Sequence, residues 1–436
     1  MIQARRKVAD SSQTLLQTAA SSAGGDVRKA QHVGLPEVGV PQLPIDELGN
    51  ANASDFEMTL PPNELYIDSG LAENIAILHV YECGDNQYSL WGNGPRGKFL
   101  DPNSRTNPKN LSLGKMVTGK KGDPTYREWP RDLLGKIVAF SEQNLMLLKW
   151  LRELVSERPF LIIADHTKFE IPWEMLGVEW GEYVGVMLAT SRWGHMLGRT
   201  GPLSLTLQPD TCRGRIEGHI DRKTFNRSDH DKLVFGGLNP QIFDDIVQFR
   251  ARLMEAVSDV GLVYIGAHGT FDENRLGKIR IGPEKTDPKI TRTSSIRLLE
   301  SYSERWQLIK DSGCIVFLNA CHSGRLAITP DEVGDRSQRG LSQLFLRAGA
   351  RGVISTLGPV EDHHGFRMAQ ALITKASQEV QGEPIGELLR VMRSQAMQNI
   401  LVDEPNDDDI FHFIYTFMYV YYGNPRITLT LTQGGL

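Results

Sequence analysis

Two short stretches of the chain follow the same pattern: Leu262-Val263-Tyr264-Ile265-Gly266-Ala267-His268-Gly269 and Cys314-Ile315-Val316-Phe317-Leu318-Asn319-Ala320-Cys321. In each, a run of β-branched and aromatic residues leads through small residues to a reactive side chain. Such short, uniformly apolar runs are typical of strands buried on both faces of a parallel sheet. Because the carboxyl ends of these strands open onto the ligand crevice, we expect His268 and Cys321 to face each other across one substrate.

These two side chains are the ones that thiol-dependent cleavage of a peptide bond requires. Cys321 supplies the nucleophilic sulfur, and His268 protonates the leaving amine. Negative charge then builds on the carbonyl oxygen, and fixed backbone N–H groups must stabilise it. We assign this oxyanion role to the amides of Gly269 and Cys321, because a residue without a Cβ lets a substrate approach closely. The stretches therefore predict a catalytic dyad of His268 and Cys321.

Each of the two residues, taken alone, also has a structural explanation. A lone cysteine in a strand is usually a small buried hydrophobic residue, and we expect Cys314 to be one. A lone histidine at the end of a strand usually has a structural hydrogen bond. Here, however, His268 and Cys321 follow equivalent strands, and both are flanked by glycine or alanine. This agreement favours the catalytic interpretation.

The composition of the chain excludes several other classes of protein. The 436 residues suffice for two or three domains, or for one large α/β domain with additions. A formal net charge of −5 gives no basic footprint for nucleic acid or for an anionic membrane. No apolar stretch approaches the roughly 20 residues that span a bilayer. The four cysteines include no Cys-x-x-Cys pair, so we expect neither a disulfide framework nor a zinc knuckle, and we expect reduced thiols and a cytoplasmic location.

The pattern along the chain divides it into three regions. Residues 1–50 are rich in Ser, Ala, Gly, Gln and Pro, which predicts a disordered tail. Residues 51–129 read as a small β-rich accessory region, with a hairpin formed by 74–81 and 87–91. From residue 130 to 436, strands alternate with helices, which predicts an α/β domain whose mainly parallel central sheet is flanked by helices.

Individual elements follow from the spacing of apolar residues. Segment 203–231 is long and polar, and we leave it unassigned as a candidate regulatory insertion. The helices are expected over 138–157, 240–258, 341–348, 363–377 and 385–398, and the strands over 160–164, 183–189, 232–237, 262–266, 314–318 and 352–357.

Several other patterns suggest a site but are better explained structurally. Gly92–Lys98 fits the Gly-x4-Gly-Lys spacing of a phosphate loop, but Phe99 stands where Ser or Thr would bind magnesium, so we expect a surface turn and disfavour a nucleotide-binding protein. His363-His364 beside Asp362 resembles a metal site, yet adjacent helical positions face different directions. His322 is interpreted as a loop residue, and the acidic segment 403–409 as a solvated loop.

The sequence blocks also resemble a known family. Val263–Gly269 and Ile315–Gly324 resemble the hydrophobic-His-Gly and hydrophobic-Ala-Cys signatures of caspase-like cysteine peptidases, which also have about 50 residues between histidine and cysteine. More narrowly, they resemble the CHAT domains, the branch related to separase. The resemblance covers roughly residues 130–436, and the weaker blocks that agree with it are 160–165 with 171–176, 349–357 with Pro359 and Asp362, and 422–425.

This resemblance implies a caspase-like α/β sandwich and a cysteine endopeptidase that acts on a protein substrate without a cofactor. It also implies regulation by an activating protein partner or sensor in a prokaryotic defence or cell-death pathway. The rival function is a catalytically idle scaffold or interaction protein that keeps the fold. Retention of His268, Gly269 and Cys321 together argues against that rival.

Resemblance to separase further implies that Asp362, with Glu361 beside it, lines the primary specificity pocket and selects a basic P1 residue. Asp362 is equally suited to cap the helix that is expected to start near His363, and the sequence leaves both roles open. Asp272 is a weaker candidate for substrate contact, and a turn is its more ordinary role.

Overall fold

The structure is a computed structural model that describes residues 73–84, 86–101, 105–106, 111–113, 124–179, 182–199, 201–222, 234–283, 295–330, 336–378, 382–402 and 405–433. All of these residues belong to one compact unit. The predicted disordered tail, residues 1–50, lies outside the described residues, as does its boundary with the next region. The other domain boundary, at 129/130, stays a prediction.

A mixed sheet of 14 strands runs through the described part of the chain. The run from β21 to β18 is parallel, as is the run from β20 to β1, and the two runs are antiparallel where β18 meets β20. In spatial order the strands are β19 (Glu383–Pro384), β21 (Ile427–Leu431), β9 (Asp210–Ile220), β11 (Val260–Gly266), β15 (Ile315–Asn319), β18 (Gly352–Thr356), β20 (Tyr419–Gly423), β8 (Thr190–Trp193), β5 (Phe160–Asp165), β1 (Ile75–Gly84), β2 (Gln87–Gly94) and β3 (Gly97–Leu100), with β10 (Gln241–Phe243) beside β9 and β4 (Arg105–Thr106) beside β2.

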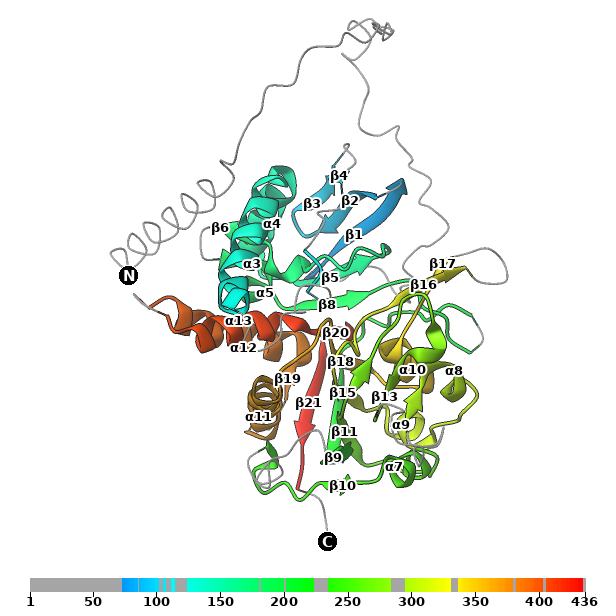
Figure 1. Cartoon of the computed structure of the whole chain (residues 1–436). Coiled ribbons are helices and arrows are strands. Elements are labelled where there is room, and N and C mark those ends of the chain that lie inside the picture. The colour runs from blue at the N-terminus through cyan, green and yellow to red at the C-terminus, as the bar shows by residue number, and fades with distance from the viewer. Residues whose placement is uncertain are drawn as a thin grey trace, which may run out of the picture. The chain divides into compact units, whose positions relative to one another are not determined.

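Helices cover both faces of the sheet around β11 and β15 (Figure 1). Val263 and Ile265 of β11 belong to the apolar core on the side of α7, α9 and α10, whereas Leu262 and Tyr264 belong to the core formed with α11 and α12. The predicted fold class, a mainly parallel α/β sheet flanked by helices, is therefore confirmed. The helices are α3 (Pro124–Glu142), α4 (Leu145–Glu157), α5 (Val184–Met187), α7 (Ile246–Leu253), α8 (Leu298–Ser301), α9 (Gln307–Ser312), α10 (Leu341–Ala348), α11 (Asp362–Gln378), α12 (Ile385–Ile400) and α13 (Asp407–Met418).

The loops between these elements contain short 3₁₀ turns and short strands. Two are 3₁₀ turns, η2 (Trp173–Met175) and η3 (Leu276–Lys278). The remaining strands form small separate sheets: β12 (Gly269–Thr270), β13 (Arg280–Ile281) and β14 (Ile296–Arg297); β16 (Ala327–Pro330) and β17 (Arg336–Arg339); and β6 (Gly177–Glu179) and β7 (Glu182–Tyr183).

The predicted N-terminal hairpin is confirmed as β1 and β2, which pair antiparallel. The glycine-rich segment 92–98 forms the tight turn between β2 and β3, with Gly94 paired to Gly97, as expected of a surface turn. These strands do not form a sheet of their own. β1 pairs in parallel with β5, so they extend the central sheet.

Two predicted elements differ from the structure, each for its own reason. The single helix expected over 138–157 is divided into α3 and α4, and the side-chain amide of Asn144 donates to the Phe140 carbonyl at 2.7 Å where α3 ends. The strand expected over 183–189 is split between β7, the short helix α5 and the approach to β8. An apolar run of this length fits a buried helical turn as well as a strand.

The segment 203–231 contains a strand of the central sheet, so its interpretation as an insertion is wrong. β9 lies between β21 and β11, and Glu217 within it is fully buried. Arg215 and Arg252 both donate to the Glu217 carboxylate, at distances between 2.6 and 3.1 Å. Burial alone raises the pKa of Glu217, but these hydrogen bonds outweigh it and lower the pKa overall. β9 therefore lacks the uninterrupted apolar run that predicts a buried strand, because its buried carboxylate is compensated by two arginines.

The two elements expected after β9, a strand over 232–237 and a helix over 240–258, also differ from the structure. The described part of 232–237 forms the end of a helical turn, and the helix expected over 240–258 is shorter, with β10 before it. The side chain of Asp245 accepts a hydrogen bond from the Val247 amide at 2.8 Å, which caps α7 at its N-terminus.

The acidic segment 403–409 is not only a loop, because α13 begins at Asp407. Asn406 caps this helix, and its side-chain oxygen accepts a hydrogen bond from the Asp409 amide at 2.9 Å. Acidic residues in the first turn interact favourably with the positive end of the helix dipole. The same residues that suggested a solvated loop therefore start a helix whose other side chains enter the core.

Candidate active site

The register of β11 against β15 brings the two predicted catalytic residues to the same edge of the sheet. Gly266 is paired with Asn319, and His268 and Cys321 each follow two residues later. The Ala267 amide donates to the Asn319 carbonyl at 3.4 Å, so the chains stay adjacent beyond the strands. His268 is exposed, and Cys321 is half-buried.

Gly269 lies directly against the backbone of Cys321. A Cβ added at Gly269 would lie 2.9 Å from the Cys321 carbonyl carbon and closer still to its oxygen. Two unbonded carbon atoms normally stay about 3.5–4.0 Å apart, so only glycine fits here. The absence of a side chain at this position thus allows the loop after β11 to touch the loop after β15.

A buried asparagine holds the end of β15 in place. The side-chain amide of Asn319 donates to the Tyr264 hydroxyl at 2.9 Å and to the Gly365 carbonyl at 3.1 Å. Its side-chain oxygen accepts from the Tyr419 hydroxyl at 2.6 Å. These bonds tie β15 to β11, to the first turn of α11 and to β20, and so fix the level at which Cys321 leaves the sheet.

The turn after Cys321 has a strained backbone that hydrogen bonds to neighbouring segments hold in place. His322 has a φ of 59°, in the left-handed region that residues other than glycine rarely adopt. The His322 amide donates to the Gly358 carbonyl at 3.0 Å, and the Thr356 hydroxyl donates to the Ala320 carbonyl at 2.6 Å. Burial and the nearby Arg325 lower the pKa of His322 to about 4, so its ring is neutral at pH 7.

The thiol of Cys321 is covered by the backbone that follows β18. The Val360 amide donates to the sulfur at 3.5 Å, and the Val360 carbonyl oxygen lies 3.9 Å from it. Burial raises the pKa of the Cys321 thiol, and the Val360 hydrogen bond opposes this rise only in part. Cys314 contrasts with it: this thiol is fully buried, and burial raises its pKa to about 12, as expected of a core residue.

The three predicted substrate-binding carboxylates occupy different surroundings. Glu361 and Asp362 follow Val360 directly, which puts them in the same loop that covers the thiol. Asp362 is itself the first residue of α11, where a carboxylate favours the helix N-terminus. Asp272 accepts from Arg275 at 2.6 Å and from the Asn274 amide at 3.2 Å, the hydrogen bonding of a local turn.

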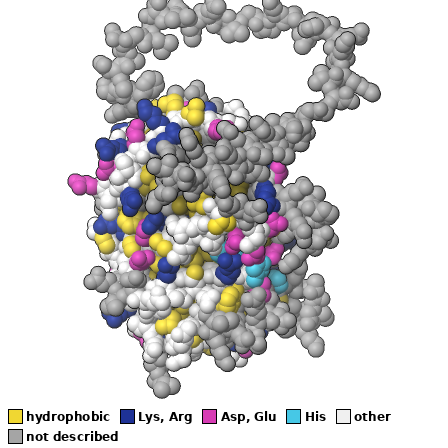
Figure 2. All heavy atoms as spheres, turned by 90° about the vertical axis from the view of Figure 1, so that its left-hand side faces the viewer, with side chains coloured by type: hydrophobic (Ala, Val, Ile, Leu, Met, Phe, Trp, Pro, Cys, Tyr) yellow, Lys and Arg dark blue, Asp and Glu magenta, His cyan; other side chains and the backbone are white. Residues whose placement is uncertain are grey.

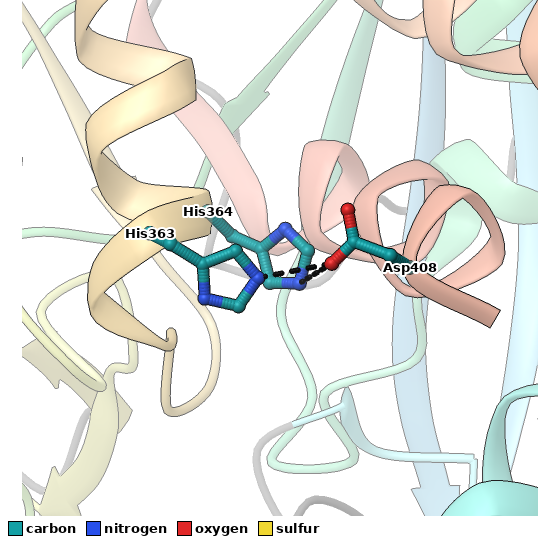
Figure 3. Close-up of side chains that lie close together, drawn as sticks. All are labelled: His363, His364 and Asp408. Carbon is teal, nitrogen blue, oxygen red and sulfur yellow. Dashed lines mark hydrogen bonds and ion pairs between the residues drawn. The ribbon is translucent and has the colours of Figure 1, made fainter.

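The sequence interpretation missed one cluster of potential metal ligands. In this cluster His363 and His364 lie together beside Asp408 of α13 (Figure 3). We expected the two rings to face different directions, and this is wrong: their centroids lie 3.8 Å apart, at an interplanar angle of 40°. The ligand atoms of the three residues lie within 4.8 Å of one another. The signal that was available is the cap and acidic first turn at 406–409, which predicts a helix start near Asp408.

The charges on the face shown in Figure 2 are mixed. Lys and Arg side chains alternate there with Asp and Glu side chains, in line with the small net charge of the chain. In the part of the chain that the structure describes, no helix combines the length and the apolar character needed to cross a bilayer.

The chain is similar to several solved structures at low sequence identity. No curated protein sequence matches the chain. Separase in the Saccharomyces cerevisiae separase–securin complex is similar in structure, with a TM-score of 0.44 and 11% identity, over 82% of this chain and 30% of that chain. Porphyromonas gingivalis RgpB, in the complex of its pro- and mature domains, is similar with a TM-score of 0.39 and 11% identity, over 66% of this chain and 70% of that chain.

The match to a protein family covers the part of the chain that holds both candidate catalytic residues. Residues 240–412 match the family model of the CHAT domain. This range includes β11, β15 and β18 with the loops that follow them. Residues 240–412 of this chain are therefore similar to the CHAT domain, the family that its His-Gly and Ala-Cys blocks resemble.

Proposed function

We propose that the protein is a cysteine endopeptidase in which Cys321 is the nucleophile and His268 the general acid and base. One observation carries the proposal: Gly266 and Asn319 are paired in register, so the two side chains leave adjacent parallel strands at equivalent positions. The contact between Gly269 and the Cys321 backbone supports the same pairing.

The proposed reaction has two stages. His268 takes the proton of the Cys321 thiol, and the sulfur attacks the scissile carbonyl carbon while the Gly269 and Cys321 amides stabilise the oxyanion. The carbon–nitrogen bond then breaks, His268 protonates the leaving amine, and a thioester remains on Cys321. Water, deprotonated by His268, attacks the thioester, which releases the carboxylic acid and restores the thiol.

We further propose that the described conformation is a resting state. The raised pKa of the Cys321 thiol keeps it protonated, and the thiolate is the reactive form. Displacement of the Val360 backbone would expose the sulfur and let His268 ionise it. Binding of a protein partner or sensor is a suitable trigger, and the family resemblance suggests a cytoplasmic enzyme of a prokaryotic defence or cell-death pathway.

A catalytically idle scaffold is the second candidate, and the raised pKa of Cys321 favours it as well. The two functions differ in one respect: a substrate-like peptide electrophile can itself displace the Val360 backbone of a latent enzyme and react with the thiol, whereas a scaffold has no peptide-binding cleft that would bring the electrophile there. The test is mass-spectrometric labelling of the purified protein with peptide acyloxymethyl ketones that carry Arg, Leu or Asp at P1.

An adduct on Cys321, formed about 10²-fold or more slowly in His268→Ala and not at all in Cys321→Ala, supports the enzyme. The scaffold is supported instead if none of the three ketones labels Cys321 while iodoacetamide does. In that case the fold would be retained for binding a partner without cleaving it.

The specificity of the enzyme is proposed to favour a basic P1 residue, selected by Asp362 with help from Glu361. Both carboxylates directly follow Val360, whose backbone contacts the thiol, which supports this role. In Asp362→Asn we expect the Arg ketone to lose its advantage over the Leu ketone. Asp272→Asn is the matched control, because the Asp272 carboxylate is bound within its own turn. Equal rates for the two ketones in the unmodified protein would contradict a basic preference.

A further inference from the structure

The first turns of α11 and α13 bring three potential metal ligands together, outside the proposed dyad. Nε2 of His363 lies 3.1 Å from Oδ1 of Asp408, and Nε2 of His364 lies 3.9 Å from the same oxygen. We propose that His363, His364 and Asp408 form a binding site for a zinc-type divalent transition-metal ion. Figure 3 shows both rings directed at this one carboxylate.

The spacing of these atoms suits a metal better than a hydrogen-bond network. A single carboxylate oxygen faces two imidazole nitrogens, and 3.9 Å is too long for a hydrogen bond. Tetrahedral zinc with bonds of about 2.0–2.2 Å places neighbouring ligand atoms about 3.3–3.6 Å apart. The two observed nitrogen–oxygen separations bracket this range, and all three ligand atoms lie within 4.8 Å of one another, so side-chain adjustments of up to about 1 Å would bring both nitrogens and the oxygen within bonding distance of one ion.

The residues around the three ligands orient them. Arg367 donates to Oδ2 of Asp408 at 3.1 Å, which leaves Oδ1 facing the histidines. Glu361 lies 3.6 Å from Nδ1 of His363, on the side of the ring opposite Nε2. A carboxylate on this side of the ring favours a positive charge on the imidazole, and with a small approach it would accept the Nδ1–H that metal-binding histidines usually donate. Glu361 thus has a contact that the sequence interpretation, a substrate pocket, did not foresee.

Solvent can reach the proposed site, and the ligands come from two helices. The side chain of Asp408 is 58% exposed and that of His363 is 31% exposed, whereas His364 is buried at 2%. An ion can therefore enter from solvent, bind a ligand held rigidly in the core and keep a water molecule in a fourth position. Bound there, it would link α11 to α13 through ligands 45 residues apart in sequence.

The type of ligand selects the class of metal. Two imidazole nitrogens and one carboxylate oxygen suit Zn²⁺, and Co²⁺ and Ni²⁺ bind similar sets. Calcium and magnesium prefer sites made of oxygen atoms only, so they are not expected to compete. The proposed site needs neither His268 nor Cys321, so it stands or falls independently of the peptidase function.

The test measures metal binding to the full chain that carries Cys321→Ala, because the thiol of the dyad is itself a zinc ligand. Titration calorimetry with Zn²⁺ is combined with the visible absorption of bound Co²⁺, which reports histidine ligation in a tetrahedral site. His363→Gln and Asp408→Asn each remove one ligand at an exposed position. Asp407→Asn is the matched control, because it removes the same charge from the same helical turn while its carboxylate pairs with Arg131.

We expect one saturable Zn²⁺ site per chain in the Cys321→Ala protein and in the Asp407→Asn control. Binding should weaken at least tenfold in His363→Gln and in Asp408→Asn, and the Co²⁺ absorption should be lost. Zinc should also raise the Tm of the first two proteins only, since it binds the folded state. Absence of saturable binding, or equal binding by all four proteins, would overturn the proposal and leave a carboxylate–imidazole contact without a metal.

Discussion

Replacement of Gly269 by alanine tests the arrangement of the candidate active site directly. The new Cβ would lie 2.9 Å from the carbonyl carbon of Cys321, whereas unbonded carbon atoms keep about 3.5 Å or more. The carbonyl oxygen lies closer still, so the two loops must separate by about 1 Å or slightly more. Overpacking of this kind costs about 1–3 kcal/mol of folding free energy.

The same movement should cost more in reactivity than in stability. A displacement of about 1 Å between reacting groups lowers rates by roughly 10²-fold, so we expect Gly269→Ala to label Cys321 with the peptide ketone about 100 times more slowly. The labelling rate is followed by intact-protein mass spectrometry, and the free energy of unfolding by urea titration. Both measurements use the full chain.

A second glycine of the same loop provides the control. A Cβ added at Gly277 meets only a methyl group of Leu299, at an ordinary distance of 3.7 Å. Gly277→Ala should therefore label and unfold like the unmodified protein. If Gly269→Ala behaves in the same way, the His-Gly loop does not touch Cys321 and the reasoning that pairs the two residues is refuted.

Three further outcomes follow from buried polar groups. The rate of iodoacetamide reaction at Cys321 should rise with pH to a midpoint above the ordinary cysteine value of about 8.5, because burial raises the pKa of this thiol; a lower midpoint would contradict the burial. Glu217→Gln should cost about 3 kcal/mol at pH 7 in a urea titration, since it leaves two arginines without their shared carboxylate. The fold lowers the pKa of Glu217, so the ionised carboxylate stabilises the protein above its unfolded pKa of about 4.3, and this stabilisation is lost as the pH falls below that value. The difference in free energy of unfolding between Glu217→Gln and the unmodified protein should therefore shrink below a pH of about 4.3. A difference that stays constant with pH would argue against the ion pair. Arg393→Met should cost about 2 kcal/mol, because the buried guanidinium donates to Thr190 and to the Tyr419 carbonyl, each at 2.8 Å; an unchanged Tm would show that these acceptors find other donors.

The best predicted elements are those whose residues are almost all apolar or strictly periodic. β11, β15 and β18 were recognised because strands buried on both faces need uninterrupted apolar runs. α11 and α12 were recognised from their apolar spacing, which the sheet face requires. β9 was missed for the opposite reason, since Glu217 and its arginines place compensated charge inside the core.

The candidate site was predictable to the level of single loops. The sequence pattern identifies His268 and Cys321 as residues that follow buried strands, because a buried strand requires a short uninterrupted run of apolar residues. It does not record that Val360 covers the thiol, or that Asn319 is bound by Tyr264, Tyr419 and Gly365. Those contacts join segments that are distant along the chain.

Local patterns alone thus predict the α/β class, the helices around the C-terminal strands and the two candidate catalytic side chains, since each prediction depends on residues within a few positions of one another. Strand order, the closeness of Gly269 to Cys321 and the meeting of His363 and His364 with Asp408 were decided by packing. Packing depends on which distant apolar faces fit together, and no short window of sequence contains both faces. For that reason a peptidase dyad could be expected from the amino acids, whereas the candidate metal site emerged only when α11 and α13 were seen side by side.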